Sequence, residues 1–173
     1  MFTTERLTIG PIEEDHLDDL YAVYVSNPDF LQLTEGTTYG VGVYSKEQML
    51  RDLHVAEWTG RTPCGVFLRE KHELIGFLEY WERAETDKKP WLGLLMIHRD
   101  YQRRGFGLEI VKGFLRWTEF LGWAEVRIGI LEQNEKSLFF WRSLGFEPYE
   151  VKEKRMPSGL KNVVCMRYSV KEK

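Results

Sequence analysis

The chain has 173 residues, of which 43% are hydrophobic and 29% charged, a balance typical of a folded protein with one hydrophobic core. Lysine and arginine together number 24 against 27 acidic residues, and the resulting net charge of −3 gives no overall attraction to nucleic acid or to an anionic membrane. No apolar run is long enough to cross a bilayer, and neither Cys64 nor Cys165 belongs to a CxxC pair.

These features predict one domain over residues 1–173, located in the cytoplasm, and we expect a monomer or a homodimer. The first residues lack the apolar core of a signal peptide. The two cysteines are expected to be buried thiols. The four histidines show no metal-ligand spacing, so no metal is expected.

The first third of the chain predicts a strand and two helices. Alternating apolar residues indicate a strand over Arg6–Pro11, and helical spacing follows over Glu13–Val25. Proline, glycines and aromatic residues over Ser26–Tyr44 predict an ordered but mobile loop. Ser45, followed three residues later by Gln48, is a capping-box pattern that predicts a helix to about Trp58.

The middle of the chain predicts a hairpin and a buried strand. The hairpin comprises Cys64–Glu70 and Leu74–Trp81, and a charged loop, Glu82–Lys89, follows it. Trp91–Ile97 is almost wholly apolar, as in a central strand buried on both faces. Gly93 within that strand indicates a bulge or a close backbone approach.

The last third alternates helices and strands. In order, we expect a helix from Gly105 to Leu121, a strand with Val126, Ile128 and Ile130, a helix over Lys136–Leu144, and two strands near Tyr149–Met156 and Val163–Val170. The order βααβββαβαββ predicts a mixed α/β domain.

The junction from Ile97 to Leu108 carries the clearest chemical signal. A helix start offers unpaired N–H groups and the positive end of the helix dipole, which together attract phosphate. Gly105 and Gly107 would let a phosphate approach the backbone, and Gln102, Arg103 and Arg104 add donors. The stretch is neither a P-loop nor a GxGxxG fingerprint. A glycine-rich turn with a solvated basic face remains the alternative.

Two motifs resemble those of one family. The hexapeptide from Gln102 to Gly107, Gln-Arg-Arg-Gly-Phe-Gly, is similar to the Q/R-x-x-G-x-G/A signature of the GNAT superfamily of acyl-CoA-dependent N-acyltransferases. Asn134 to Ser137, together with Leu144-Gly145-Phe146, resembles that family's second signature. The element order also resembles that of the family over nearly the full chain.

The resemblance implies a mostly antiparallel sheet with one splayed parallel pair that holds acetyl-CoA. Strand Leu94–Ile97 would separate from Glu125–Leu131 and pair with the pantetheine arm, and one of its amides would polarise the thioester carbonyl. The residues implied to contact the coenzyme are Leu95, Met96, Ile97, Gln102, Arg103, Arg104, Gly105, Phe106, Gly107, Leu108, Asn134, Ser137 and Trp141. For Asn134, a helix cap is an alternative role that is compatible with the first.

The sequence departs from the family where proton transfer is concerned. Many members carry a tyrosine as general acid where this chain has Trp141, which cannot supply a proton near neutral pH. Trp141 is therefore expected to pack, and Ser137 is one possible substitute donor. The central strand also lacks the family's glutamate base. Glu79, then Glu35, then His98 are the candidate bases, in that order.

The acceptor pocket is expected between Phe30–Tyr44 and the loop Glu82–Lys89. Phe30, Glu35 and Tyr39 are its candidate substrate contacts, and Asp29 and Glu35 favour a cationic amine. The opening Arg6-Leu-Thr-Ile-Gly-Pro-Ile modestly resembles the branch that acetylates protein N-termini.

The implied activity is direct transfer of an acetyl group from acetyl-CoA to a primary amine in a ternary complex. Protein N-termini, polyamines, amino acids and other small amines remain open as acceptors. Because both usual proton-transfer residues are missing, a non-catalytic acyl-CoA-binding module is the alternative. Neither nucleic acid nor a membrane is an expected partner.

Overall fold

The computed structural model describes residues 1–36 and 44–170, and the strands among them form one sheet in the order β1-β2-β3-β4-β5-β6-β8-β7. The strands are β1 (Phe2–Thr3), β2 (Leu7–Gly10), β3 (Thr62–Leu68), β4 (Leu74–Trp81), β5 (Trp91–Ile97), β6 (Glu125–Leu131), β7 (Glu147–Met156) and β8 (Gly159–Ser169). Neighbouring strands are antiparallel except β5 and β6, which run parallel. The mixed, mostly antiparallel sheet confirms the predicted fold class.

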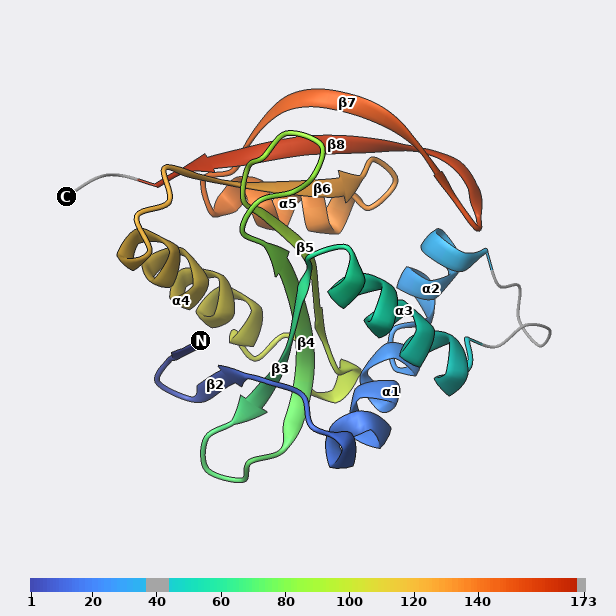
Figure 1. Ribbon diagram of the computed structural model, residues 1–173, viewed down its shortest axis with the longest axis vertical. Coiled ribbons are helices and arrows are strands. Elements are labelled where there is room, and N and C mark those ends of the chain that lie inside the picture. Colours follow the sequence, from blue (N-terminus) through green and yellow to red (C-terminus); the bar gives the residue numbers. More distant parts are fainter. Residues whose placement is uncertain (37–43, 171–173) are drawn as a thin grey trace.

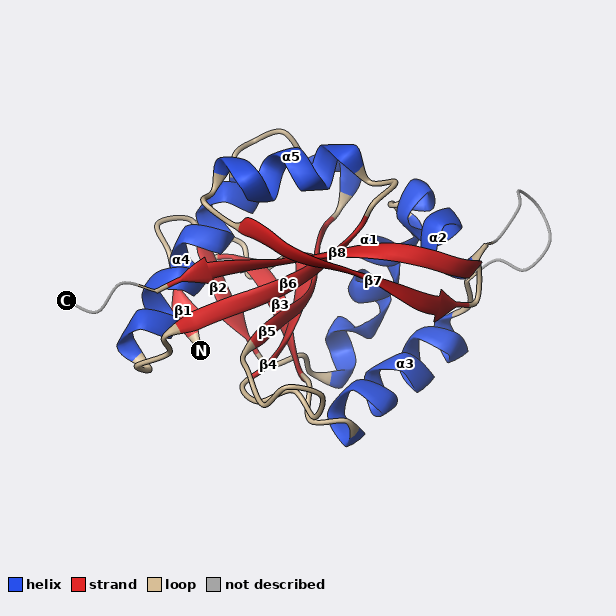
Figure 2. Ribbon diagram, turned by 90° about the horizontal axis from the view of Figure 1, so that it is seen from above, coloured by secondary structure: helices blue, strands red, loops and turns tan. Residues whose placement is uncertain are grey.

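Helices cover both faces of the sheet (Figures 1 and 2). They are α1 (Leu17–Val25), α2 (Pro28–Glu35), α3 (Lys46–Trp58), α4 (Phe106–Phe120) and α5 (Glu135–Ser143). One core cluster joins α4 and α5 to the sheet and includes Phe114, and a second joins α1 to α3 and includes Phe77. Strand β4 is buried along almost its whole length because it contributes side chains to both cores.

Strands β5 and β6 are joined only at their first residues. The register pairs Trp91 with Arg127 and Leu92 with Ile128, and from Gly93 onward β5 no longer pairs with β6. On its other side, the pairing of β4 with β5 skips Gly93, because Glu79 pairs with Leu94 and Tyr80 with Leu92. The predicted bulge at Gly93 is thus confirmed, and a gap opens in the middle of the sheet.

The prediction of a continuous loop over Ser26–Tyr44 is wrong, because its first part contains α2. Pro28 occupies the first helical position, where its missing N–H costs nothing, and Gly36 ends the helix with a left-handed φ of 71°. Residues 37–43, with Tyr39, lie outside the described residues.

The start of the chain also differs from the prediction. A short strand β1 precedes β2, which itself begins at Leu7 rather than Arg6. The helix predicted from Glu13 begins as a 3₁₀ turn, Glu14–His16, and becomes α-helical only at Leu17. The observed order therefore contains one strand and one helix beyond βααβββαβαββ.

Within residues 1–36 and 44–170, no helix has the length and apolar character needed to span a membrane.

Candidate active site

The turn between β5 and α4 leaves backbone amides free at the helix start. Arg103 and Gly105 adopt left-handed backbone conformations, with φ of 64° and 82°. The first hydrogen bond of α4 runs from Glu109 N to Gly105 O, at 3.1 Å. The amides of the three residues between them, 106–108, therefore have no acceptor within the helix. This geometry suits an anion such as a diphosphate.

The side chains of this turn have distinct roles. Gln102 Nε2 donates to Asn27 Oδ1 at 2.7 Å and to Ile97 O at 2.8 Å, so its side chain fixes the end of β5. Arg103 and Arg104 are exposed, and the Arg104 guanidinium lies 5.3 Å from the Tyr101 ring centroid. The side chains of both arginines are thus available to bind an anion. The Gln102 side chain is already engaged, so only its backbone is available.

Gly107 and α5 bring the second motif close to the first. A Cβ at Gly107 would lie 3.6 Å from both Ile97 Cδ1 and the Phe140 ring, so α5 lies against the start of α4. Leu95, Met96 and Ile97 lie on the part of β5 that faces the gap, where their backbone groups lack a β6 partner. Phe106 is buried in the core and Leu108 is exposed. The proposed coenzyme contacts of these residues remain predictions.

Asn134 caps α5. Its Oδ1 accepts a hydrogen bond from Ser137 N at 3.1 Å, so the capping role considered for Asn134 is realised. The side-chain NH₂ group of Asn134 is not needed for the cap and can donate elsewhere. Ser137 is half-buried, and its role as a proton donor remains a prediction.

Trp141 lies in an aromatic cluster. It is 6% exposed, and its ring meets Phe140 and Phe146 edge to face at centroid distances of 5.2 and 5.1 Å. These contacts give the indole a packing role, as expected for a residue that cannot act as an acid.

Glu79 lies where the gap opens. A Cβ added at Gly93 would be 3.4 Å from Glu79 Oε1 and 2.7 Å from the Trp81 ring, so only glycine fits beside this carboxylate. Arg61 Nη1 donates to Glu79 Oε1 at 2.8 Å. Burial raises the pKa of Glu79, while Arg61 opposes that rise. The first-ranked candidate base is therefore buried, ion-paired and next to the gap.

Glu35 is a second acidic residue on the side of the sheet that carries α1 to α3. It is half-buried at the end of α2 and accepts a hydrogen bond from Gln48 Nε2 at 3.0 Å. Burial, and then the nearby charge of Asp52, raise the pKa of Glu35. Asp52 itself accepts a hydrogen bond from Tyr44 Oη at 2.7 Å.

Two buried tyrosines of the core lie near these carboxylates. The rings of Tyr24 and Tyr44 stack with centroids 5.1 Å apart. The pKa of each phenol is raised, primarily by burial. The Tyr44 hydroxyl already donates its one proton to Asp52, so it can only accept a further hydrogen bond.

The remaining predicted contacts fall in different places. Phe30 packs against the core beneath α2. His98 accepts a hydrogen bond from Asp100 N at 3.3 Å. It follows the last residue of β5 and is four residues from Leu94, which pairs with Glu79. In the loop 82–89, Asp87 accepts hydrogen bonds from Trp91 Nε1 and Arg127 Nη1. Of the ranked bases, Glu79 and Glu35 lie on the side of the sheet that carries α1 to α3. His98 lies just beyond the end of the central strand β5.

Sequence reasoning missed Arg61, Asp52 and Tyr24, whereas Tyr44 is the last residue of the predicted acceptor segment. Arg61 lies 18 residues before its partner Glu79, and no local pattern connects the two. Asp52 lies within α3, and no motif distinguishes it from the other charged residues of that helix. In the described part of the chain, no group of three or more histidine, cysteine or acidic side chains is placed to hold a metal ion.

The free amides at a helix start and the gap between two parallel strands are features that suit an acyl-CoA-dependent acyltransferase. The family model described as "Acetyltransferase (GNAT) domain" matches residues 6–147. The chain belongs to the GNAT acetyltransferase family.

Solved structures share the fold over nearly the full chain. An acetyltransferase from Thermus thermophilus has 20% identity and a TM-score of 0.71, with 98% of this chain and 99% of that chain covered. A spermidine N-acetyltransferase from Vibrio cholerae, in complex with CoA and spermine, has 16% identity and a TM-score of 0.68, with 95% and 96% covered. RimL, a ribosomal L7/L12 alpha-N-protein acetyltransferase in complex with coenzyme A, has 14% identity and a TM-score of 0.74, with 96% of both chains covered. No curated protein matches the sequence significantly.

Proposed function

We propose that the protein transfers an acetyl group from acetyl-CoA to a primary amine that arrives as a cation, with Glu79 as general base. The observation that carries this proposal is the position of Glu79. Its carboxylate lies beside Gly93, where β5 leaves β6, and it is buried on the side of the sheet that also carries Glu35.

The coenzyme half of the proposal rests on free backbone groups. The amides of residues 106–108 suit the diphosphate, and the edge of β5 from Gly93 onward suits the amide groups of the pantetheine arm. When bound, acetyl-CoA supplies the activated acyl group. An amide of β5 near the gap would stabilise the negative charge that develops on the carbonyl oxygen.

Direct attack by the amine is favoured over an acyl-enzyme. Both cysteines are buried, and burial raises the pKa of the Cys64 thiol to about 11 and that of Cys165 above its usual value. Neither thiol is therefore a ready nucleophile at neutral pH. The ammonium would instead lose one proton to Glu79, and the free amine nitrogen would then bond to the carbonyl carbon as the carbon–sulfur bond breaks. A second proton from the nitrogen would pass to the departing thiolate, which gives the amide and the free thiol of coenzyme A.

The charges near Glu79 favour a cationic acceptor. Glu35 and Asp52 can attract an ammonium group, while Arg61 neutralises Glu79 itself. Two of the structural neighbours act on a polyamine and on a protein N-terminus, and both kinds of amine are cations at neutral pH. Polyamines and basic peptide N-termini are therefore the first acceptors to test.

Mass spectrometry of an amine library with acetyl-CoA tests the proposal. The library contains polyamines, peptides with free N-termini, amino acids and drug-like amines, and at least one cationic amine should gain an acetyl group. Glu79→Gln should lower kcat by about 10²–10⁴ and leave the Kd for coenzyme A unchanged, because a general base contributes that much to rate.

Glu70→Gln is the matched control, since it removes an exposed carboxylate from the turn between β3 and β4, away from the expected acceptor pocket. A Glu79→Gln enzyme with nearly full kcat would contradict the assignment of the base. Coenzyme A binding without turnover of any amine would favour a non-catalytic acyl-CoA-binding module.

A further inference from the structure

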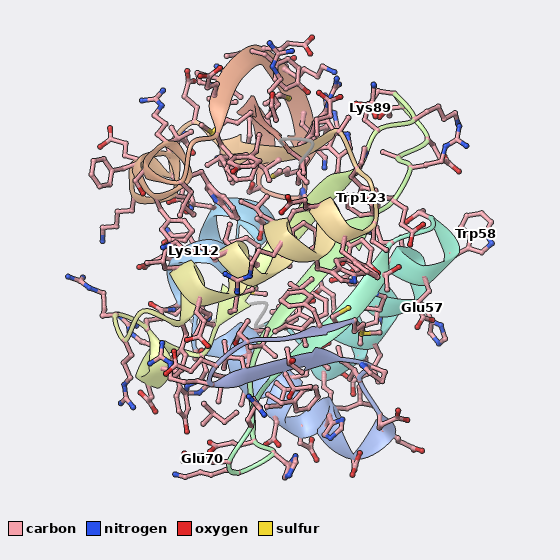
Figure 3. The ribbon with its side chains drawn as sticks, turned by 90° about the vertical axis from the view of Figure 1, so that its left-hand side faces the viewer. Glu57, Trp58, Glu70, Lys89, Lys112 and Trp123 are labelled. Atoms are coloured by element: carbon pink, nitrogen blue, oxygen red, sulfur yellow. The ribbon has the colours of Figure 1, made fainter. Side chains whose placement is uncertain are left out.

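The turn between β1 and β2 contacts the first turn of α4, although the two segments are about a hundred residues apart in sequence. Figure 3 shows the first strands running alongside α4, whose Lys112 side chain is labelled. Arg6 lies in this turn, which a hydrogen bond from Thr4 N to Leu7 O closes at 2.9 Å. The residues of this turn form hydrogen bonds with Glu109, which lies in the first helical turn of α4.

Arg6 bonds to both sides of the α4 start. Its Nε and Nη2 lie 2.7 and 2.6 Å from Glu109 Oε2, and its Nη1 donates to Arg104 O at 3.2 Å. Its guanidinium also lies 4.2 Å from the Phe106 ring centroid. The planar side chain of Arg6 thus contacts Arg104 and Phe106, on either side of Gly105, and also Glu109 in α4.

Two further hydrogen bonds hold the Glu109 carboxylate. The Arg6 backbone N–H and the Thr4 hydroxyl both donate to Glu109 Oε1, at 2.8 and 2.6 Å. The Glu109 side chain is 16% exposed and that of Arg6 44% exposed. The carboxylate is therefore enclosed, while the guanidinium stays open to solvent on one side.

The position of Glu109 creates an electrostatic conflict that Arg6 resolves. A carboxylate in the first turn of a helix complements the helix dipole, but it repels a phosphate bound at the same end. The Arg6 guanidinium cancels this charge and also lies at the turn itself, since Nη2 is 3.6 Å from the place that a Cβ on Gly105 would occupy.

We propose that Arg6 is a positioning residue for the coenzyme's diphosphate: it holds the turn from Arg103 to Gly105 in its anion-binding shape and neutralises Glu109. This inference rests on the proposed function, in which the diphosphate binds the amides of residues 106–108. It assigns a role to the Arg6 motif at the start of the chain.

The test compares coenzyme A with pantetheine, which lacks the diphosphate together with the adenosine and its 3′-phosphate. Dephospho-coenzyme A, which keeps the diphosphate and lacks only the 3′-phosphate, should respond to Arg6→Met as coenzyme A does. In the full chain, Arg6→Met should raise the Kd for coenzyme A about tenfold, as the loss of a charge-assisted contact would, and change the Kd for pantetheine less than about twofold. Calorimetry measures the first Kd and NMR titration the second.

Lys112→Met is the matched control for charge, because it removes one exposed cation from the same helix, one turn beyond Glu109. It should change neither Kd. Should Arg6→Met fail to fold, Arg6→Lys keeps the charge but not the planar fork, and it should raise the Kd for coenzyme A about threefold.

A double variant separates the two parts of the role. Arg6→Met with Glu109→Gln should bind coenzyme A more tightly than Arg6→Met alone, because the unpaired carboxylate is gone. Equal binding by the two variants would overturn the charge argument.

Other outcomes overturn the proposal in distinguishable ways. Unchanged coenzyme A binding in Arg6→Met, or an equal loss for both ligands, would show that Arg6 has no role or only a structural one. If the unaltered protein itself binds coenzyme A no better than pantetheine, the diphosphate site of the proposed function is wrong, and the role of Arg6 falls with it.

Discussion

At Glu79, burial and an ion pair act in opposite directions on one carboxyl group. Burial raises its pKa, and Arg61 stabilises the charged form at 2.8 Å. A base must be ionised before it can accept a proton, so the rate should rise with pH through the raised pKa of Glu79. Arg61 is thus needed to keep the base charged, although it also makes the carboxylate less basic.

Trp141 should matter for packing more than for chemistry. Trp141→Phe keeps an aromatic ring against Phe140 and Phe146, and it should lower kcat by less than about tenfold, since one uncharged hydrogen bond contributes roughly 1 kcal/mol. Steady-state kinetics with an identified amine measures the effect. A loss of more than about a hundredfold, with normal stability and coenzyme affinity, would show that the indole N–H takes part in the reaction.

At the scale of elements, α2 and the β7–β8 hairpin are in contact beside the proposed acceptor site. The tip of the hairpin reaches α2 (Figure 1), where Ser158 Oγ donates to Leu33 O at 2.5 Å and Ser158 N to Thr34 O at 3.1 Å. Glu35 follows these carbonyls directly. The contact therefore sets where this carboxylate lies relative to the gap.

Gly36→Ala should disturb that contact. The position has a left-handed φ of 71°, and a Cβ there would lie 2.9 Å from Ser158 Cα. The φ alone costs about 1 kcal/mol of folding free energy. The clash should also move α2 from the hairpin and raise the KM for the amine several-fold, without changing the Kd for coenzyme A.

Gly60→Ala is the control for Gly36→Ala, because it has a similar φ of 76° and nothing within 4 Å of the added Cβ. The strained φ should lower the stability of Gly60→Ala by a similar amount, but the KM for the amine and the Kd for coenzyme A should not change. Equal amine KM values in the two variants would show that the Ser158 contact does not shape the acceptor site.

The sequence predicted elements well where local rules decide them and less well elsewhere. The Gly105 turn, the helix behind it and the bulge at Gly93 follow from residues close together in the chain. Helix α2 was missed because its Pro28 and Gly36, which mark the two ends of a short helix, also fit a loop. Only one residue of α2, Leu31, is buried, so its apolar periodicity is weak.

At the scale of the whole molecule, the contacts on which these proposals depend join segments that are distant in sequence. Arg6 meets Glu109, Arg61 meets Glu79, and Ser158 meets Leu33. None of these pairs has a signal in a single sequence, because each depends on how strands and helices pack. The candidate site was therefore predictable at its motifs but not at their partners.

The link between β1–β2 and α4 should make stability depend on acid. Burial would raise the pKa of Glu109, but hydrogen bonds from Thr4 and Arg6 lower it below its ordinary value of 4.5. A lowered folded-state pKa stabilises the protein above pH 4.5, and this contribution is lost as the pH falls through the folded-state value. Glu109→Gln should lower the free energy of unfolding by about 1.5–3 kcal/mol at pH 7, and this difference should shrink below pH 4.5.

Urea unfolding at several pH values measures the Glu109 contribution. Glu5→Gln, an exposed neighbour in the same turn, is the control and should change little at any pH. A Glu109→Gln deficit that stays constant down to pH 3 would contradict the role of the ionised carboxylate.

The gap between β5 and β6 also has a mechanical meaning. The half of the sheet from β1 to β5 and the half from β6 to β7 are joined by two residue pairs, Trp91 with Arg127 and Leu92 with Ile128. A load that separates the halves would meet little resistance from backbone bonds at this line. A coenzyme arm lying in the gap would act as a missing strand, so the protein should be stiffer, and should resist pulling better, while it holds its acyl donor.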